Sequence, residues 1–229
     1  MLAATAAQDL LLIGLAIVVA RMSGPRPLFH LGVRRFKLSR GALYAFVAFA
    51  AFIAFLTLWT QLLNVDQQDD LAQELGARDS AFNTAAVAVL VCLIAPIAEE
   101  LFFRGFMFGA LRRPLGWIGA AVVTGIVFGL IHAGGTDAVF LAPLAVLGFL
   151  LCWLYRKTGS LLPGMAVHAF NNALALGSTL HWDPLAIVAI VVAAPLVVVA
   201  VAWLIAVPQG RAPAPEPDPP AFLPPIAPR

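Results

Sequence analysis

The chain has 229 residues, of which 62% are hydrophobic and only 11% are charged. A soluble domain carries roughly 25% charged residues, so this composition excludes an ordinary soluble protein and indicates a chain that crosses the bilayer several times. The net charge of +2 does not suggest a nucleic-acid partner, and the lipid bilayer is the first partner that we expect.

Successive apolar segments predict an all-α, polytopic transmembrane bundle of about seven spans, with an eighth span or a re-entrant piece as the alternative. The segments cover about 1–20, 42–63, 82–111, 115–133, 138–155, 161–180 and 184–207. The first is weak because Gln8 and Asp9 interrupt it. Its basic residues come after its apolar run, so we expect a retained helix and not a cleaved signal peptide.

Charged residues are sorted between the loops. The loop 21–40 carries six basic residues and no acid, and further basic pairs stand at 112–113 and 156–157. The loop 64–80 instead holds five acidic residues against one arginine. The positive-inside rule then places the N-terminus outside and the C-terminus in the cytoplasm of an integral protein of the cell membrane.

The chain divides into four parts on this pattern. We expect two N-terminal helices with their basic and acidic loops over 1–80, a core over 81–180 and a last transmembrane helix over 181–207. The Pro-rich tail 208–229 cannot build a packed core, and we expect it to be disordered.

Three charged side chains interrupt the third apolar segment, namely Glu99, Glu100 and Arg104. A charge near the bilayer centre costs about 2.5–3.5 kcal/mol on insertion scales, and such residues mark function by default. Glu100 and Arg104 are four residues apart, so a structural ion pair explains both. That pair leaves Glu99 without a local partner, and Pro96 could bend the helix to aim it.

The fourth segment carries His132, and the sixth carries His168, Asn171 and Asn172. Together with Glu99 these groups form a hydrolytic set, in which the carboxylate activates a water, His132 holds it, and His168 and Asn172 stabilise an oxyanion. Zinc held by His132, His168 and a carboxylate is the alternative. From the residues alone, metal-dependent and metal-free reactions are equally open, and a proton relay is a third possibility.

Three motifs stand in order on separate apolar segments: EExxxR at 99–104, FxxxH at 128–132 and HxxxN at 168–172. As a set they resemble the CPBP family of CAAX proteases and bacteriocin-processing enzymes, which includes the type II CAAX prenyl endopeptidases. The resemblance covers about 81–180. It implies an intramembrane endopeptidase that cleaves membrane-associated peptides, prenylated CAAX-type proteins among them, by a metallo- or a glutamate-dependent mechanism.

The resemblance also assigns roles to the residues. Glu99 becomes the general base with Glu100 and Arg104 supporting it, His132 positions the water, and His168 with Asn172, selected over Asn171, stabilises the oxyanion. A non-proteolytic membrane scaffold or a bacteriocin-immunity protein is the competing function. A proton-coupled transporter ranks below it, because the sequence shows no inverted repeat.

Depth in the membrane poses a difficulty for this site. Counting about 1.5 Å per residue puts His132 near the outer end of its segment and Glu99 nearer the cytoplasm. The helices therefore have to be tilted, broken or offset, and Pro96 and Pro114 are candidate causes. Gly125 and Gly129, four residues apart, predict a close helix contact on the fourth segment.

Overall fold

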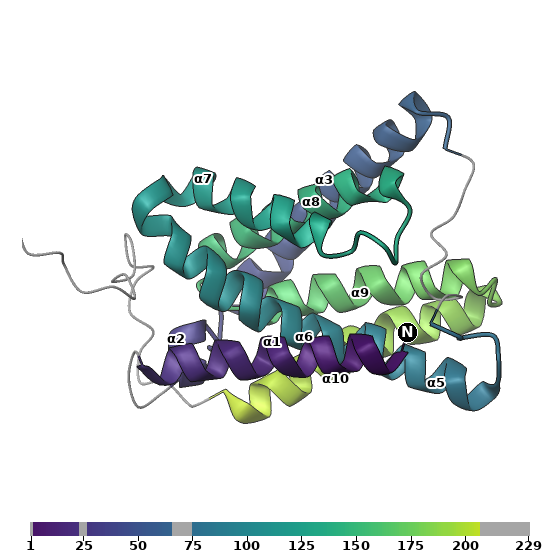
Figure 1. Ribbon diagram of the computed structural model, residues 1–229, viewed down its shortest axis with the longest axis horizontal. Helices are drawn as coiled ribbons and strands as arrows, with labels where there is room; N and C mark the ends of the chain where they lie inside the picture. The colour runs from purple at the N-terminus through teal and green to yellow at the C-terminus, as the bar shows by residue number, and fades with distance from the viewer. Residues whose placement is uncertain (1, 23–26, 66–74, 207–229) are drawn as a thin grey trace, which may run out of the picture.

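The computed structural model describes residues 2–22, 27–65 and 75–206, and these form a bundle of helices without a strand, as the sequence predicts (Figure 1). Most of the acidic loop, at 66–74, and the predicted tail 208–229 lie outside the described residues. The tail and the division into four parts therefore stay predictions.

The helices follow one another with short connections. They are α1 (Leu2–Met22), α2 (Pro27–Leu31), α3 (Leu38–Leu62), α5 (Ala81–Val89), the π-helix η1 (Leu90–Ile94), α6 (Ala95–Glu99), the π-helix η2 (Glu100–Met107), α7 (Phe108–Leu130), α8 (Ala138–Thr158), α9 (Leu162–Thr179) and α10 (Pro184–Ile205). The short helix α2 and the two π-helices are features that the apolar pattern does not predict.

Five helical runs in the described part of the chain are long and apolar enough to cross a bilayer. They are Leu2–Met22, Leu38–Leu62, Ala81–Leu130, Ala138–Thr158 and Pro184–Ile205. The run Ala81–Leu130 is broken at Gly116, whose backbone is not helical, and α9 adds a shorter and more polar helix. Counted in this way, seven long helical segments stand where the sequence predicts about seven.

The position of the break corrects one expectation. Arg112, Arg113 and Pro114 were expected to end the third segment, but the helix continues through them to Gly116. Gly116 has φ 66° and ψ 172°, a conformation that is open essentially to glycine alone. Glycine, and not proline or arginine, therefore sets where the chain turns back (Figure 1).

Contacts between distant residues support an alternating path of the segments. Arg156 at the end of α8 lies over the ring of Trp117, just after the turn. At the other end of the bundle, the indole N–H of Trp59 donates to the carbonyl of Val139, which joins the end of α3 to the start of α8. The end of α8 therefore lies beside the second half of α7, and the end of α3 lies beside the start of α8.

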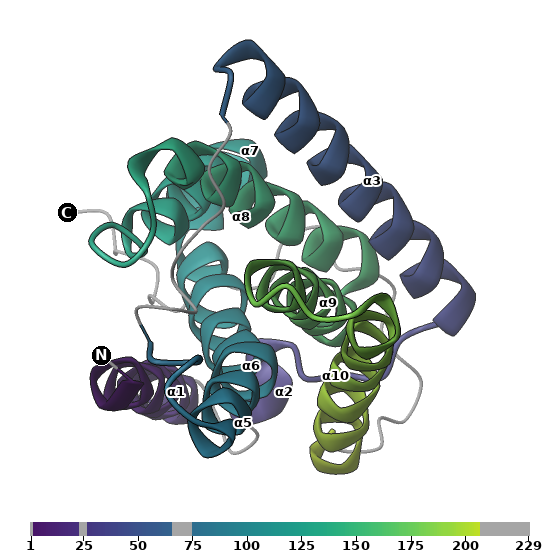
Figure 2. The same cartoon turned by 90° about the vertical axis from the view of Figure 1, so that its right-hand side faces the viewer.

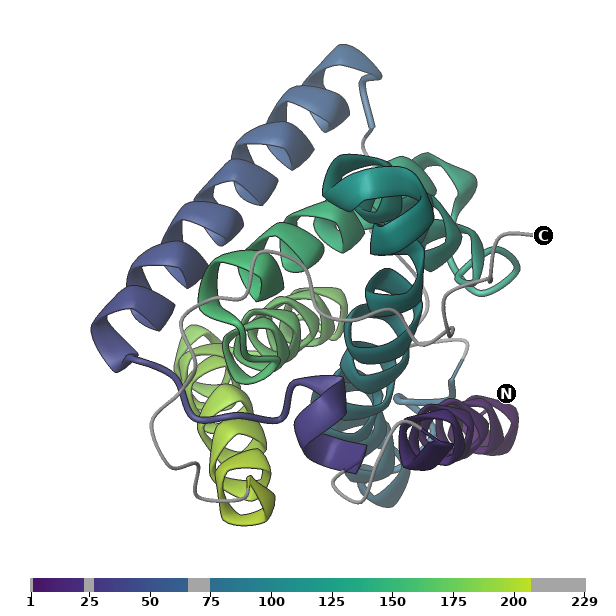
Figure 3. The same ribbon diagram turned by 90° about the vertical axis from the view of Figure 1, so that its left-hand side faces the viewer.

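The helix α9 occupies the centre of the bundle, with α8 and α3 on one side and α6 and α10 on the other (Figures 2 and 3). The glycines of α7 let α8 approach closely beside it. A Cβ on Gly125 or Gly129 would come within 2.6 or 2.5 Å of a backbone oxygen of α8. The close helix contact predicted for these glycines is confirmed.

Candidate active site

Pro96 shapes the backbone on which Glu99 stands. A proline lacks an N–H and clashes with the carbonyl four residues earlier, and the π-helix η1 covers that position. In a π-helix each carbonyl accepts from the backbone N–H five residues later. The partner of the Val91 carbonyl would be Pro96, which has no N–H to donate. The side-chain amide of Asn172 fills the place and donates to Val91 O at 2.9 Å.

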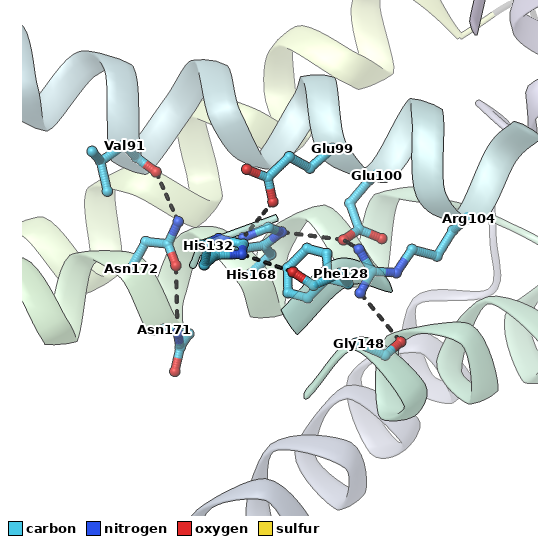
Figure 4. A network of polar contacts seen from close by, with 10 residues as sticks. All are labelled: Val91, Glu99, Glu100, Arg104, Phe128, His132, Gly148, His168, Asn171 and Asn172. Atoms are coloured by element: carbon cyan, nitrogen blue, oxygen red, sulfur yellow. Dashed lines mark hydrogen bonds and ion pairs between the residues drawn. The ribbon is translucent and has the colours of Figure 1, made fainter. Parts of the chain in front are cut away.

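Asn172 therefore ties α9 to the helix that carries Glu99 (Figure 4). Its amide oxygen accepts from Asn171 at 3.4 Å. A primary amide carries two N–H groups, so one remains for a ligand after the bond to Val91. The structural use of Asn172 comes in addition to the role that the motif implies for it.

Glu100 and Arg104 form the ion pair that their spacing predicts. Nη1 of Arg104 lies 2.9 Å from Oε1 of Glu100, and neither side chain is exposed. Nη2 of Arg104 donates to the carbonyl of Gly148 on α8 at 3.2 Å, and the guanidinium lies 4.4 Å from the ring centroid of Phe128. The pair is thus held by α7 and α8 as well as by its own helix.

His168 lies between the two glutamates. Its Nδ1 is 3.2 Å from Oε1 of Glu100, and its Nε2 is 3.7 Å from Oε2 of Glu99. The second distance is too long for a direct hydrogen bond but leaves room for a water that touches both atoms. Oε2 of Glu99 is buried and has no hydrogen-bond partner in the described part of the chain. This oxygen is therefore available to a water or a ligand.

Phe128 brings the second histidine to the same place. Its ring centroid lies 5.1 Å from that of His132 and 5.6 Å from that of His168. Nδ1 of His132 is 2.8 Å from the carbonyl of Phe128. A carbonyl only accepts, so Nδ1 carries the hydrogen and Nε2 is left for a ligand. Figure 4 shows both imidazoles beneath Glu99.

The turn at Gly116 removes the difficulty of depth. Glu99 lies 17 residues before Gly116, and His132 lies 16 residues after it. In two helices that run back along each other from one turn, residues equally distant from the turn reach the same level. The start of α9 lies level with Gly105, because Leu161 donates to the carbonyl of Gly32 and a Cβ on Gly105 would lie 2.8 Å from the carbonyl oxygen of Leu31. His168 is six residues from Leu162, as Glu99 is six residues from Gly105, so both reach the same level. All three motifs therefore meet at one level of the bundle.

The same geometry bears on the expected zinc site. Among the residues that the structure describes, no three histidine, cysteine, aspartate or glutamate side chains group in a way that could hold a metal ion. Both ring nitrogens of His168 face carboxylate oxygens, Nδ1 that of Glu100 and Nε2 that of Glu99. Zinc dependence therefore stays a prediction.

One acidic residue at the site escaped the reasoning from sequence. Asp9 of α1 is fully buried, and charge interactions join it to Glu99 and His168. The signal was present, since a single carboxyl within an apolar helix is a functional candidate by the same rule that selects Glu99. Gly164 is a second missed residue, because a Cβ there would lie 2.9 Å from Oε2 of Glu100.

Comparisons with known proteins agree with the motifs. Residues 81–174 match the family described as type II CAAX prenyl endopeptidase Rce1-like, which confirms the resemblance to the CPBP family. The chain is 30% identical over 80 residues to UPF0177 protein YxdF of Lactococcus lactis (35% of this chain, 42% of that protein). It is 27% identical over 88 residues to the candidate membrane peptidase YdiL of Bacillus subtilis (38% and 35%).

A third relative, YyaK of Bacillus subtilis, is 37% identical over 110 residues (44% of this chain, 35% of that protein). The chain thus spans less than half the length of the curated relatives that it matches. No solved structure matches it.

Proposed function

We propose that the protein is an intramembrane endopeptidase, from the match of its residues 81–174 to the Rce1-like family of type II CAAX prenyl endopeptidases. One observation carries the proposal. Glu99 is only 6% exposed, and its buried Oε2 faces Nε2 of His168 across 3.7 Å. A carboxylate held beside a hydrogen-bond donor, with space for a water between them, is equipped to hydrolyse an amide.

Glu99 acts as the general base in the proposed reaction. The water oxygen bonds to the scissile carbonyl carbon while one water proton passes to Glu99 and the carbonyl π electrons move to its oxygen. When the C–N bond breaks, Glu99 returns this proton to the leaving nitrogen, and the second water hydrogen stays on the new carboxyl group. A positioned base of this kind contributes about 10²- to 10⁴-fold to the rate.

Hydrogen-bond donors surround the place where negative charge develops. Nε2 of His168, in the imidazolium form that carries a hydrogen on both ring nitrogens, and the free amide N–H of Asn172 are the proposed oxyanion donors. Each is worth about 10²- to 10³-fold where such donors have been removed. His132 offers Nε2 to the attacking water. Glu100 fixes the ring of His168 through Nδ1, and Arg104 neutralises Glu100.

Membrane-held peptides are the proposed substrates. The site lies within a 50-residue apolar run, so a peptide bond reaches it more readily from the bilayer than from water. Prenylated CAAX-type proteins are the substrate class that the family premise suggests. Metal-free catalysis is proposed for this chain, because both nitrogens of His168 already face carboxylates.

The test is cleavage of a fluorogenic peptide library by the purified protein in liposomes. Each peptide is offered with and without a prenyl group, and each reaction is run with and without a strong zinc chelator. We expect cleavage that ignores the chelator and is absent from the Glu99→Gln variant. If the chelator abolishes cleavage and added zinc restores it, the proposal that catalysis is metal-free is wrong. Cleavage by Glu99→Gln at the wild-type rate would overturn the proposal as a whole.

Two other functions make different predictions in the same experiment. A membrane scaffold or a bacteriocin-immunity protein keeps its phenotype when Glu99 and His168 are replaced, because packing alone carries it. A proton-coupled transporter moves a solute across the liposome membrane and loses that flux in Glu99→Gln, without any cleavage.

A further inference from the structure

The aromatic ring of Phe128 lies where four helices meet. Its side chain is fully buried on α7. From η2, Phe103 packs edge to face against it, with 5.3 Å between the ring centroids. From α8, a Cβ on Gly148 would lie 3.1 Å from Cβ of Phe128, and from α9 the ring of His168 lies 5.6 Å away. Because a protein interior is close-packed, a change in this side chain moves groups on each of these helices.

The face of this ring holds the arginine of the site. The guanidinium carbon of Arg104 lies over the ring, 4.4 Å from its centroid. A cation is attracted to the electron-rich face of an aromatic ring, and burial strengthens the attraction because water does not compete. Nε of Arg104 has no hydrogen-bond partner among the residues described, so the ring takes part of the place of a polar partner. Arg104 is thus positioned by Phe128 as well as by Glu100.

The same ring contacts both imidazoles of the site. Its centroid lies 5.1 Å from that of His132 and 5.6 Å from that of His168 (Figure 4). The plane of His168 stands at 74° to the ring, in the edge-to-face arrangement that aromatic pairs prefer. His168 also faces Glu100, whose Oε1 lies 2.9 Å from Nη1 of Arg104. The ring therefore constrains His168 by two routes, through direct contact and through the ion pair.

We propose that Phe128 is a positioning residue, whose ring face fixes Arg104 and, through Glu100, the imidazole of His168. The resemblance to the family assigns no role to this phenylalanine. The kinetic part of the proposal rests on the proposed function, whereas the positioning of the imidazole does not. Core packing alone is the competing explanation, and it predicts that any buried phenylalanine of α7 behaves in the same way.

Phe108 is the matched control for that explanation. It is also a fully buried residue of α7, the guanidinium of Arg112 lies 5.1 Å from its ring centroid, and Tyr155 is its aromatic neighbour at 6.3 Å. These partners lie outside the site. Phe128→Leu and Phe108→Leu each remove a buried ring and its contact with a cation, so we expect both to lower the unfolding temperature by a similar amount.

The position of the imidazole is tested first without any substrate. Nitrogen-15 NMR spectra of the full chain in liposomes, labelled at its four histidines, report the hydrogen bonds of each ring nitrogen. The signals of His168 are identified by their loss in His168→Gln. We expect them to change in Phe128→Leu, while those of His30 and His181 stay, and we expect all signals to stay in Phe108→Leu. Unchanged signals of His168 in Phe128→Leu, or an equal change in Phe108→Leu, would overturn the proposal.

The kinetic test replaces Phe128 by phenylalanines that carry one, two or three ring fluorines. Fluorine nearly keeps the shape of the ring and weakens its attraction for a cation. We expect kcat to fall stepwise with the number of fluorines at position 128, and to stay at the wild-type value for the same series at position 108. For Phe128→Leu we expect kcat to fall about 10- to 100-fold with KM nearly unchanged, because a shift of about 1 Å in a catalytic group costs on the order of 10²-fold.

A constant kcat across the fluorinated series at position 128, or wild-type kcat in Phe128→Leu, would refute the positioning role. If neither the wild type nor any variant cleaves a peptide, the proposed function is refuted, while the nitrogen spectra still decide whether Phe128 positions His168.

Discussion

Gly164 gives the carboxylate of Glu100 the space that it occupies. An ideal Cβ at this position would lie 2.9 Å from Oε2 of Glu100 and 3.6 Å from its carboxyl carbon. Ordinary contacts begin near 3.4 Å, so in Gly164→Ala the carboxylate has to move by about half an ångström. Glu100 is also held by Arg104 at 2.9 Å and by His168 at 3.2 Å, and the displacement therefore passes to the imidazole.

The expected effect is on the rate more than on binding. A shift of about 1 Å in a catalytic group costs on the order of 10²-fold, so we predict a 10- to 100-fold fall in kcat for Gly164→Ala with KM nearly unchanged. Overpacking costs about 1–3 kcal/mol, and the better helix propensity of alanine offsets up to about 1 kcal/mol of it. Peptide cleavage and thermal unfolding in detergent measure the two effects.

The same helix offers a matched control. In Gly177→Ala the new Cβ would also lie 2.9 Å from its nearest atom, which is Cγ1 of Ile187 on α10. The crowding is equal, but the neighbour is an apolar side chain outside the site. We expect a similar loss of stability with wild-type kcat. If both variants cleave equally well, the claim that Gly164 positions Glu100 is wrong.

Three further changes test parts of the structure. Gly116→Ala should lower stability by about 1–3 kcal/mol because its backbone conformation excludes a Cβ. Gly14→Ala, with open space inside α1, should instead raise stability by up to about 1 kcal/mol in thermal unfolding. Arg104→Met removes the arginine partner of the buried Glu100 carboxylate and should cost about 3–5 kcal/mol, most of which a second change, Glu100→Gln, recovers in a double-mutant cycle. Asn172→Leu leaves a backbone carbonyl unsatisfied and should cost about 1–3 kcal/mol in the same assay.

The helical fold and the three motifs could be predicted because each depends on local pattern. Long apolar runs indicate transmembrane helices. The four-residue spacing of Glu100 and Arg104 predicts that they share a helix face, and the ion pair between them confirms it. The meeting of the motifs could not be predicted from local pattern, because it depends on where one helix turns back. Pro114 is typical of a helix end, but the chain turns at Gly116. Moving the turn by two residues changes which residues of the two helices lie at the same level, and the alignment of Glu99 with His132 depends on it.

Two other features of the site, the hydrogen bond of Asn172 and the burial of Asp9, could not be predicted from single segments of the sequence. The proline at 96 indicates a disturbed helix, but not that Asn172, far along the chain, supplies the hydrogen bond lost at Val91. Asp9 could be seen as an acid in an apolar helix, but only the packing of α1 on α6 and η2 shows that it is buried within the bundle. Such pairings depend on tertiary contacts, which a single sequence does not reveal.

The central claim is that Glu99 acts on the water and does not serve to bind the substrate. The most direct measurement determines kcat and substrate affinity on one preparation of Glu99→Gln in liposomes, with its unfolding temperature as a check on folding. We predict that kcat falls by about 10²-fold or more while affinity and unfolding temperature stay at wild-type values. Wild-type kcat in this folded variant would contradict the role of Glu99 as the base.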